Sequence, residues 1–364
     1  MRRLLAALSF TLLATAFAGC SIERLELKAD APPAKPLPAA LAARFAYDAS
    51  APVKPALEKL DETDTFVKFR GVYDGQGAGA AAGEGSKPSG SPAVASSGAP
   101  VTFEYWRSKL GGDGPRPVVL VVPILAGNYP ECDHLGRLMA RNGMHCFFVH
   151  REDNILALEK DRSEPFEQKL RRSIVNIRRT LDWACAQPEV DRAKVGLVGI
   201  SMGAISGSIV MAVEPRIRAG VLIMGGGDLP GIICDSIETP VRRYKVHRMR
   251  DNDWTEAQFR ADVRRQLQSD PLDFAPFVGA ARVQQYISLY DNKVPTVYQW
   301  KLWKALGGPE GFAIPIGHYT SIFYLPFAER NAMAFMKKRL GVTDLPPEAP
   351  DAAAAKVASA SSSK

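Results

Sequence analysis

Histidine, closely spaced cysteines and long apolar segments are all scarce in this sequence. Its 364 residues include five histidines and five cysteines, and no two of the cysteines form a Cys-x-x-Cys pair. This absence excludes the common zinc and dithiol motifs. Beyond the N-terminus, no apolar run reaches the roughly 18 residues that a membrane-spanning helix needs. Because histidines are so few, each can be weighed separately as a candidate for chemistry that depends on an imidazole.

The composition itself is that of a large globular body. Hydrophobic residues make up 46% of the chain and charged residues 23%, which suits one large domain or two ordinary ones. The formal net charge is +7, and basic residues cluster at 169–179, where a helical pattern makes them a solvated face, and at 242–250. Neither cluster resembles a nucleic-acid-binding module, so nucleic acid is not an expected partner. Contact of 242–250 with acidic lipid or polysaccharide stays open.

The N-terminal segment MRRLLAALSFTLLATAFAGC predicts export. Two arginines, an apolar stretch and small residues precede Cys20, which is the layout of a signal peptide over residues 1–19. Its end resembles a bacterial lipobox, in which the cysteine is lipidated, and Ser21 then implies the outer membrane. Phe17 replaces the usual aliphatic residue, so cleavage by the ordinary signal peptidase to a periplasmic or secreted protein stays open. We expect a cell-envelope protein anchored to the membrane by a lipid on Cys20.

The other four cysteines are open to two interpretations. Export would allow disulfides among them, with three pairings if all four join. Buried free thiols are the alternative, because Cys146 lies in an apolar predicted strand and Cys185 on a predicted helix. The remaining two are Cys132 and Cys234.

Low-complexity segments flank the central part of the chain. Residues 20–60 are rich in Ala and Pro and predict a flexible tether, while 346–364 predict a disordered tail. Residues 61–345 are expected to fold as a domain. Near its start, two strands at 66–73 and 101–110 are expected to pair as a hairpin around a Gly-, Ala- and Ser-rich loop, which covers 75–100.

Strands and helices then alternate. The β-branched run 117–125 predicts a strand buried on both faces of a parallel sheet. Further strands are predicted at 145–150, 194–199, 219–227, 282–291 and 313–319, and helices at 134–141, 166–186, 202–213, 295–306 and 321–339. This order predicts an α/β fold with a mostly parallel, twisted sheet flanked by helices. A helical insertion, 228–280, is expected over the carboxyl ends of the strands, and its Trp254 indicates either an apolar lid or ordinary packing.

The segment VGLVGISMGAISG, residues 195–207, places a serine on a tight turn between a predicted strand and a predicted helix. Gly199-x-Ser201-x-Gly203 in this context is the pattern of a nucleophile elbow. Side chains at Gly199 and Gly203 would collide where the strand and the helix meet. A serine hydroxyl needs a base that takes its proton, so Ser201 predicts a histidine and a carboxylate nearby.

The base and the acid are chosen by position. His145 and His150 bracket an apolar strand, His134 lies near a helix start and His247 lies in the basic insertion, whereas His318 stands on a glycine-containing loop after a strand-like segment. His318 is therefore the predicted base.

Asp291 follows a predicted strand and could reach the neighbouring loop, which makes it the predicted acid. Asp228, after the preceding strand, is the rival, and a helix cap is the other role open to Asp291.

The order Ser201, Asp291, His318 resembles that of the α/β-hydrolases, over about residues 100–340. The stretch DWACAQPEVDRAKVGLVGISMGA resembles the bacterial dienelactone-hydrolase-like, acetyl-esterase-like and prolyl-oligopeptidase-like branches of that superfamily. True dienelactone hydrolases use a cysteine nucleophile, and no propeller precedes this domain, so neither of those specific activities is expected. The resemblance implies the α/β-hydrolase fold and a serine hydrolase.

Acyl transfer also needs donors for the oxyanion. One is expected from the backbone N–H of Met202, at the start of the helix. The other is expected in the loop after 117–125, where Pro123 has no N–H. Leu125 is the preferred donor there, with Ile124 or Ala126 as alternatives.

These residues predict a cell-envelope serine hydrolase that cleaves carboxylic esters through an acyl-serine intermediate, with a small-molecule or acylated substrate. No metal or organic cofactor is required. A peptidase or amidase of the same fold is one alternative, because esters and amides share this machinery. A non-catalytic envelope lipoprotein that uses the fold for binding is the other.

Overall fold

The structure is a computed structural model that describes residues 21–75, 99–112, 114–125, 129–151, 156 and 166–343. The predicted signal peptide, Cys20, nearly all of the low-complexity loop and the C-terminal tail lie outside these residues.

The described residues form one ten-stranded sheet in the order β1-β10-β9-β8-β7-β5-β6-β4-β3-β2. Six neighbouring strands run parallel, as the sequence predicted: β10 (Glu310–Ile314), β9 (Val283–Ser288), β8 (Ile217–Ile223), β7 (Val190–Ile200), β5 (Arg116–Val122) and β6 (His145–Val149). In β5, Val118 and Leu120 pack into one hydrophobic cluster and Val119 and Val121 into another. Both faces of the strand are therefore covered, which explains why its sequence is apolar without alternation.

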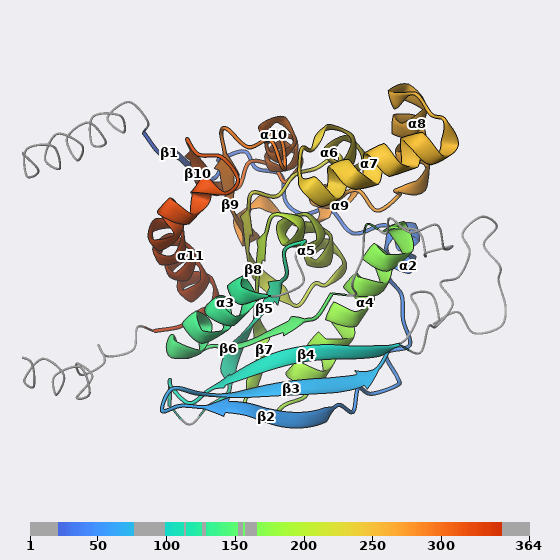
Figure 1. Ribbon diagram of the computed structural model, residues 1–364. Coiled ribbons are helices and arrows are strands. Elements are labelled where there is room, and N and C mark those ends of the chain that lie inside the picture. The colour runs from blue at the N-terminus through green and yellow to red at the C-terminus, as the bar shows by residue number, and fades with distance from the viewer. Residues whose placement is uncertain are drawn as a thin grey trace, which may run out of the picture.

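The other end of the sheet is antiparallel. β6 pairs with β4 (Pro100–Ser108), which pairs with β3 (Phe66–Asp74) and then β2 (Ala56–Glu62). The β3–β4 register runs from Phe66 opposite Ser108 to Asp74 opposite Pro100, so the predicted hairpin is confirmed. Figure 1 shows these three strands at the end of the molecule opposite helices α7 and α8.

The prediction of a flexible tether over residues 20–60 is wrong for most of that segment, which docks on the domain. β1 (Glu23–Leu25) pairs antiparallel with β10 at the sheet edge, and a short helix, α2 (Ala39–Ala43), follows. Phe45 is fully buried, and its ring lies 5.5 Å from that of Phe274. The Ala- and Pro-rich composition hides this docking, because only a few apolar side chains and the backbone hydrogen bonds of β1 and β2 hold the segment against the domain.

Helices cover both faces of the sheet. α3 (Pro130–Arg141) and α11 (Leu325–Leu340) contribute to the cluster on one face, and α4 (Phe166–Cys185), α5 (Met202–Val213) and α10 (Thr296–Ala305) to the cluster on the other. Several predicted boundaries move by a few residues. The largest changes near the site are that the strand expected at 313–319 is β10, which ends at Ile314, and that a 3-10 turn, η3 (Thr320–Tyr324), precedes α11. The four cysteines of the described residues are free thiols, three of them buried, which is the second of the two predicted alternatives.

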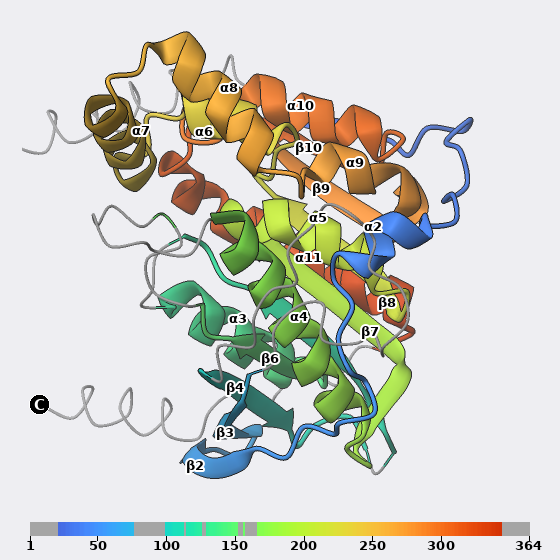
Figure 2. The ribbon, with the colours of Figure 1, turned by 90° about the vertical axis from the view of Figure 1, so that its right-hand side faces the viewer.

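The insertion at 228–280 is helical, as predicted. It contains α6 (Leu229–Asp235), α7 (Thr239–Asn252), α8 (Glu256–Gln266) and α9 (Pro271–Phe274), then the 3-10 turns η1 (Ala275–Phe277) and η2 (Ala280–Arg282). Figure 2 shows α6, α7 and α8 together at one end of the molecule. Within the described residues, no helix is both long and apolar enough to cross a membrane.

Candidate active site

Ser201 lies on a strained turn between β7 and α5. Its backbone φ of 54° and ψ of −119° fall in a region that non-glycine residues rarely adopt. A Cβ on Gly199 would lie 2.4 Å from the carbonyl oxygen of Gly203, and one on Gly203 would lie 2.0 Å from the carbonyl oxygen of Val122. The collision predicted for both glycines is therefore confirmed, and it explains why positions 199 and 203 of this turn are glycine.

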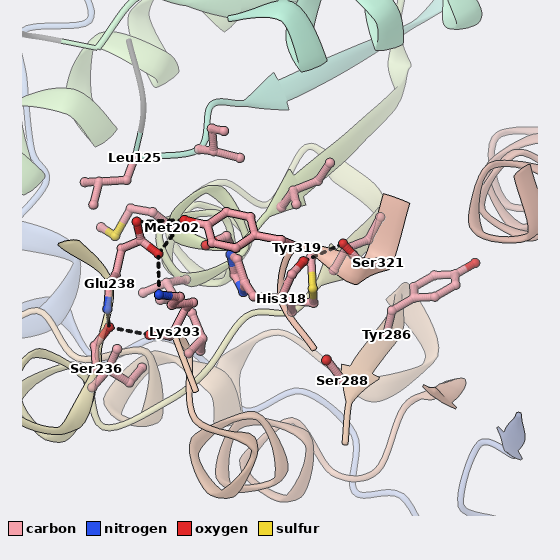
Figure 3. A pocket seen from close by; sticks show the side chains of 18 of the residues that line it. Leu125, Met202, Ser236, Glu238, Tyr286, Ser288, Lys293, His318, Tyr319 and Ser321 are labelled. Carbon is pink, nitrogen blue, oxygen red and sulfur yellow. Dashed lines mark hydrogen bonds and ion pairs between the residues drawn. The ribbon is translucent and has the colours of Figure 1, made fainter. Parts of the chain in front are cut away.

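A cavity of about 440 Å³ opens at this turn. Ile200, Ile223, Ser288 and Ile314, the last residues of β7, β8, β9 and β10, all line it. Parallel strands place their carboxyl ends along one edge, so the cavity sits where such sheets bind ligands. Ser201 and His318 both line it, and Figure 3 shows the His318 side chain near its centre.

Asp291 orients the imidazole of His318. The distance from His318 Nδ1 to Asp291 Oδ2 is 2.8 Å, and the Asp291 side chain is fully buried. The two residues follow β9 and β10, which are neighbours in the sheet. Since Nδ1 is held by the carboxylate, Nε2 is the ring nitrogen left to act on a group in the cavity.

Other groups hold Asp291 in place. Its Oδ1 accepts hydrogen bonds from the backbone N–H of Lys293 at 2.8 Å and of Val294 at 3.0 Å. Its Oδ2 accepts one from Gln299 Nε2 at 2.9 Å, and Gln299 Oε1 accepts the N–H of Ser288 at 2.9 Å. Sequence reasoning missed Gln299, since a single glutamine in a helix carries no pattern that singles it out.

The rival carboxylate, Asp228, has a different role. It is the N-cap of α6, where Oδ1 accepts the Gly231 N–H at 3.1 Å. Its Oδ2 lies 2.7 Å from Lys301 Nζ, and Arg264 is 3.5 Å from Oδ1. Burial alone would raise the pKa of Asp228, but the bonds from Lys301 and Gly231 outweigh it and hold that pKa below its usual range. Of the two candidates, Asp291 is the one bonded to His318.

The other four histidines are engaged elsewhere. His145 is fully buried between the N–H of Ser108 and the carbonyl of Glu189, and burial lowers its pKa to about 4. His150, His134 and His247 each pair with a carboxylate, and none of these four lines the cavity. The structural role predicted for His145 and His150 agrees with these contacts.

Two backbone N–H groups near Ser201 are the candidate oxyanion donors. Met202 is the first residue of α5, so its N–H belongs to the turn that a helix leaves without internal partners. Leu125 lines the cavity beside it. The N–H of Ile124 donates a hydrogen bond to Glu131 Oε1 at 3.4 Å. Because that N–H already has a partner, Leu125 is favoured over Ile124 as the oxyanion donor. Ala126, the other alternative, lies outside the described residues.

A polar cluster that the sequence did not predict stands beside His318. Tyr319 donates its hydroxyl to Glu238, 2.8 Å from both carboxylate oxygens, and Lys293 Nζ lies 3.9 Å from Glu238 Oε2. Partial burial and this carboxylate raise the pKa of Tyr319 to about 12. Figure 3 shows the three side chains together, and they connect the histidine loop to the start of α7.

The predicted apolar lid is only partly confirmed. α6 and the start of α7 contribute Ile232, Ile233 and Val241 to the cavity wall, but Trp254 does not line it. The Trp254 ring packs against the core with the Arg248 guanidinium 5.2 Å above it, so ordinary packing was the correct alternative. Among the described residues, no three His, Cys, Asp or Glu side chains are grouped so that they could hold a metal ion.

Comparison with solved structures identifies the architecture. An acetyl xylan esterase from Paenibacillus sp. R4 matches with a TM-score of 0.58 and 15% identity, over 82% of this chain and 100% of that one. Acetyl xylan esterase 1 from Thermoanaerobacterium sp. JW/SL YS485 matches with a TM-score of 0.55 and 14% identity, over 82% and 95%. The chain has the α/β-hydrolase fold. No protein-family model matches the sequence. No curated protein matches it.

Proposed function

We propose that the protein is a serine hydrolase that cleaves carboxylic esters. One observation carries the proposal: Ser201, on a strained elbow, lines the same cavity as His318, whose Nδ1 is held 2.8 Å from the buried carboxylate of Asp291. A nucleophile, a base and a group that orients the base are the parts that acyl transfer needs. The α/β-hydrolase fold shared with two acetyl xylan esterases supports the choice of an ester as substrate.

In the proposed reaction, Ser201 Oγ attacks the ester carbonyl while His318 Nε2 takes its proton. The N–H groups of Met202 and Leu125 donate to the oxyanion that forms. His318 then returns the proton to the departing alcohol, which leaves an acyl-serine. Water, deprotonated by the same imidazole, attacks this ester and releases the acid. Asp291 remains ionised throughout and stabilises the imidazolium.

We also propose a cell-envelope location, with a lipid on Cys20 as the membrane anchor. The N-terminal sequence alone supports this part. Metabolic labelling with a clickable fatty acid tests it: labelling of the wild type and not of Cys20→Ser is expected, and equal labelling of both would contradict it.

A fluorophosphonate probe tests the activated serine directly. We expect the purified protein to be labelled, and Ser201→Ala to lose at least 99% of the labelling. His318→Ala should lose nearly as much, since the hydroxyl then has no base. Ser206→Ala is the matched control: it lies one turn further along α5, and its hydroxyl only bonds the Met202 carbonyl.

The same experiment separates the alternatives. A folded wild-type protein that stays unlabelled would contradict the proposal and favour a binding role for the fold. A labelled protein that cleaves a peptide-like anilide faster than the matching ester would favour an amidase.

A further inference from the structure

Aliphatic side chains form part of the wall of the catalytic cavity. They come from α5, from α6 and α7 of the insertion, and from the loop after β9 that carries Asp291. They are Ile205, Leu229, Ile232, Ile233, Val241 and Val294, each at most 6% exposed. We call these six residues the insertion arm.

Ser236, between α6 and α7, also lines the cavity, and its hydroxyl is already satisfied. Ser236 Oγ donates to the Lys293 carbonyl at 2.6 Å and accepts the Glu238 N–H at 3.1 Å. A water molecule needs two to four polar partners to be held in a cavity. The wall therefore favours a hydrocarbon group over water or a sugar hydroxyl.

Polar groups line the cavity as well. Tyr319, Glu238 and Lys293 form the cluster between the histidine loop and the start of α7, and Ser288 and Tyr286 lie on β9, as Figure 3 shows. The cavity therefore offers both an aliphatic wall and hydrogen-bonding groups. A substrate that matches it has one hydrocarbon end and one polar end.

The size of the cavity excludes a close fit to an acetyl group. Water occupies roughly 30 Å³ in the liquid, and a methyl group is of similar size. The whole cavity, at about 440 Å³, is more than ten times that size. A two-carbon acetyl group therefore cannot contact all six side chains of the insertion arm, and an uncontacted apolar wall contributes nothing to binding.

We propose that this site takes esters with a hydrocarbon chain several carbons longer than acetyl, bound in the insertion arm. The inference rests on the proposed function and names the substrate class for it. The chain can belong to the acid or to the alcohol of the ester. The two arrangements share one recognition chemistry, and two substrate series distinguish them.

The test compares p-nitrophenyl acetate, butyrate and octanoate with ethyl, hexyl and octyl acetates. For one of the two series, we expect kcat/KM to rise at least tenfold from the shortest to the longest chain, because methylene groups that enter an apolar pocket improve transition-state binding. The series that rises identifies the side of the ester that carries the chain. A flat or falling profile in both series would overturn the proposal.

Matched variants on α7 test where the hydrocarbon chain of the substrate binds. Val241→Phe places a ring in the insertion arm, so the ratio of kcat/KM for long and short chains should fall at least tenfold. Val246→Phe makes the same substitution on the same helix at a position 57% exposed and outside the cavity, and the ratio should not change. Ile233→Phe is a second filling variant in case Val241→Phe does not fold. If the filling variants fold and keep the wild-type ratio, the chain does not bind in the insertion arm.

Two further readouts keep this proposal separate from the proposed function. A protein that the fluorophosphonate labels at Ser201 but that prefers acetyl esters overturns the chain assignment alone. Binding to Ser201→Ala requires no turnover: calorimetry should show octanoate or octanol binding at least tenfold more tightly than acetate or ethanol. Equal affinities would contradict the insertion arm whether or not the enzyme is active.

Discussion

Two loops at the same edge of the sheet place an aspartate after a parallel strand, and only one of them orients the histidine. Asp228 follows β8 and Asp291 follows the neighbouring β9. Each uses Oδ1 to accept backbone N–H groups of its own turn. The difference lies at Oδ2, which Lys301 reaches in Asp228 and which His318 and Gln299 share in Asp291.

Gln299 and Lys301 both belong to α10, two residues apart. Lys301 brings a positive charge, so the negative charge of Asp228 is already neutralised, and Arg264 is a second cationic partner. Gln299 brings a neutral amide, which fixes the position of Asp291 without neutralising it. A carboxylate that must stabilise an imidazolium has to keep its charge available. The comparison teaches that the charge of the second partner, rather than the turn itself, distinguishes the proposed catalytic carboxylate from the one that caps a helix.

Replacing each of the two aspartates by asparagine should give the largest difference in kcat between the two positions. Asp291→Asn should lower kcat by about 10⁴-fold, because the amide holds His318 in the wrong tautomer. Asp228→Asn should change kcat less than threefold, since Asn also caps helices. Ester hydrolysis by the two purified variants checks this, with circular dichroism as the folding control. A large loss in Asp228→Asn with little loss in Asp291→Asn would reverse the assignment.

Removing the neutral partner of Asp291 should have an intermediate effect. Gln299→Met deletes one hydrogen bond to Oδ2, and we expect kcat to fall about tenfold, equivalent to about 1.4 kcal/mol. Gln285→Met is the control: Gln285 is buried nearby and donates to the Gln299 carbonyl, but it does not contact Asp291. Both variants should lose thermal stability. Equal kcat in the two would show that Gln299 matters only for folding.

Removing the charged partner of Asp228 should affect stability alone, and by the smallest amount. Lys301→Met is expected to lower the free energy of unfolding by about 1 kcal/mol at pH 7, since the pair is partly exposed. The pKa of Asp228 is lowered in the folded state, so its contribution is present above the unfolded value of about 3.9 and is lost as the pH falls through the lowered folded value. Urea unfolding of wild type and variant at pH 7 and at pH 3 measures both differences. A difference that grows on acidification would contradict this sign.

Much of the architecture could be predicted from local patterns. The apolar run of β5 indicated a strand buried on both faces, and the glycines around Ser201 indicated the tight turn that the structure confirms. The pairing of β3 with β4 followed from two alternating segments. These predictions succeeded because each depends on residues close together in the chain or on burial that leaves a periodic signal.

The errors have a common physical cause. The docking of residues 21–45 depends on the pairing of β1 with the edge strand β10 and on the contact of Phe45 with Phe274, partners that lie more than 200 residues away. For Trp254 the sequence left a lid and ordinary packing open, and only the structure shows that Val241 and Ile232 line the cavity instead. Contacts between distant segments leave no pattern in either segment alone.

By itself, the sequence determined the α/β alternation, the glycine-flanked elbow at Ser201 and the position of His318 on a loop late in the chain. It did so because strand and helix periodicity and glycine sterics are local. Only the tertiary structure decided which aspartate meets the histidine, that Gln299 supports it, and that the insertion builds an apolar arm beside Ser201. Those outcomes depend on which side chains of neighbouring strands and helices arrive at the same point, and that is determined by the packing of the whole sheet.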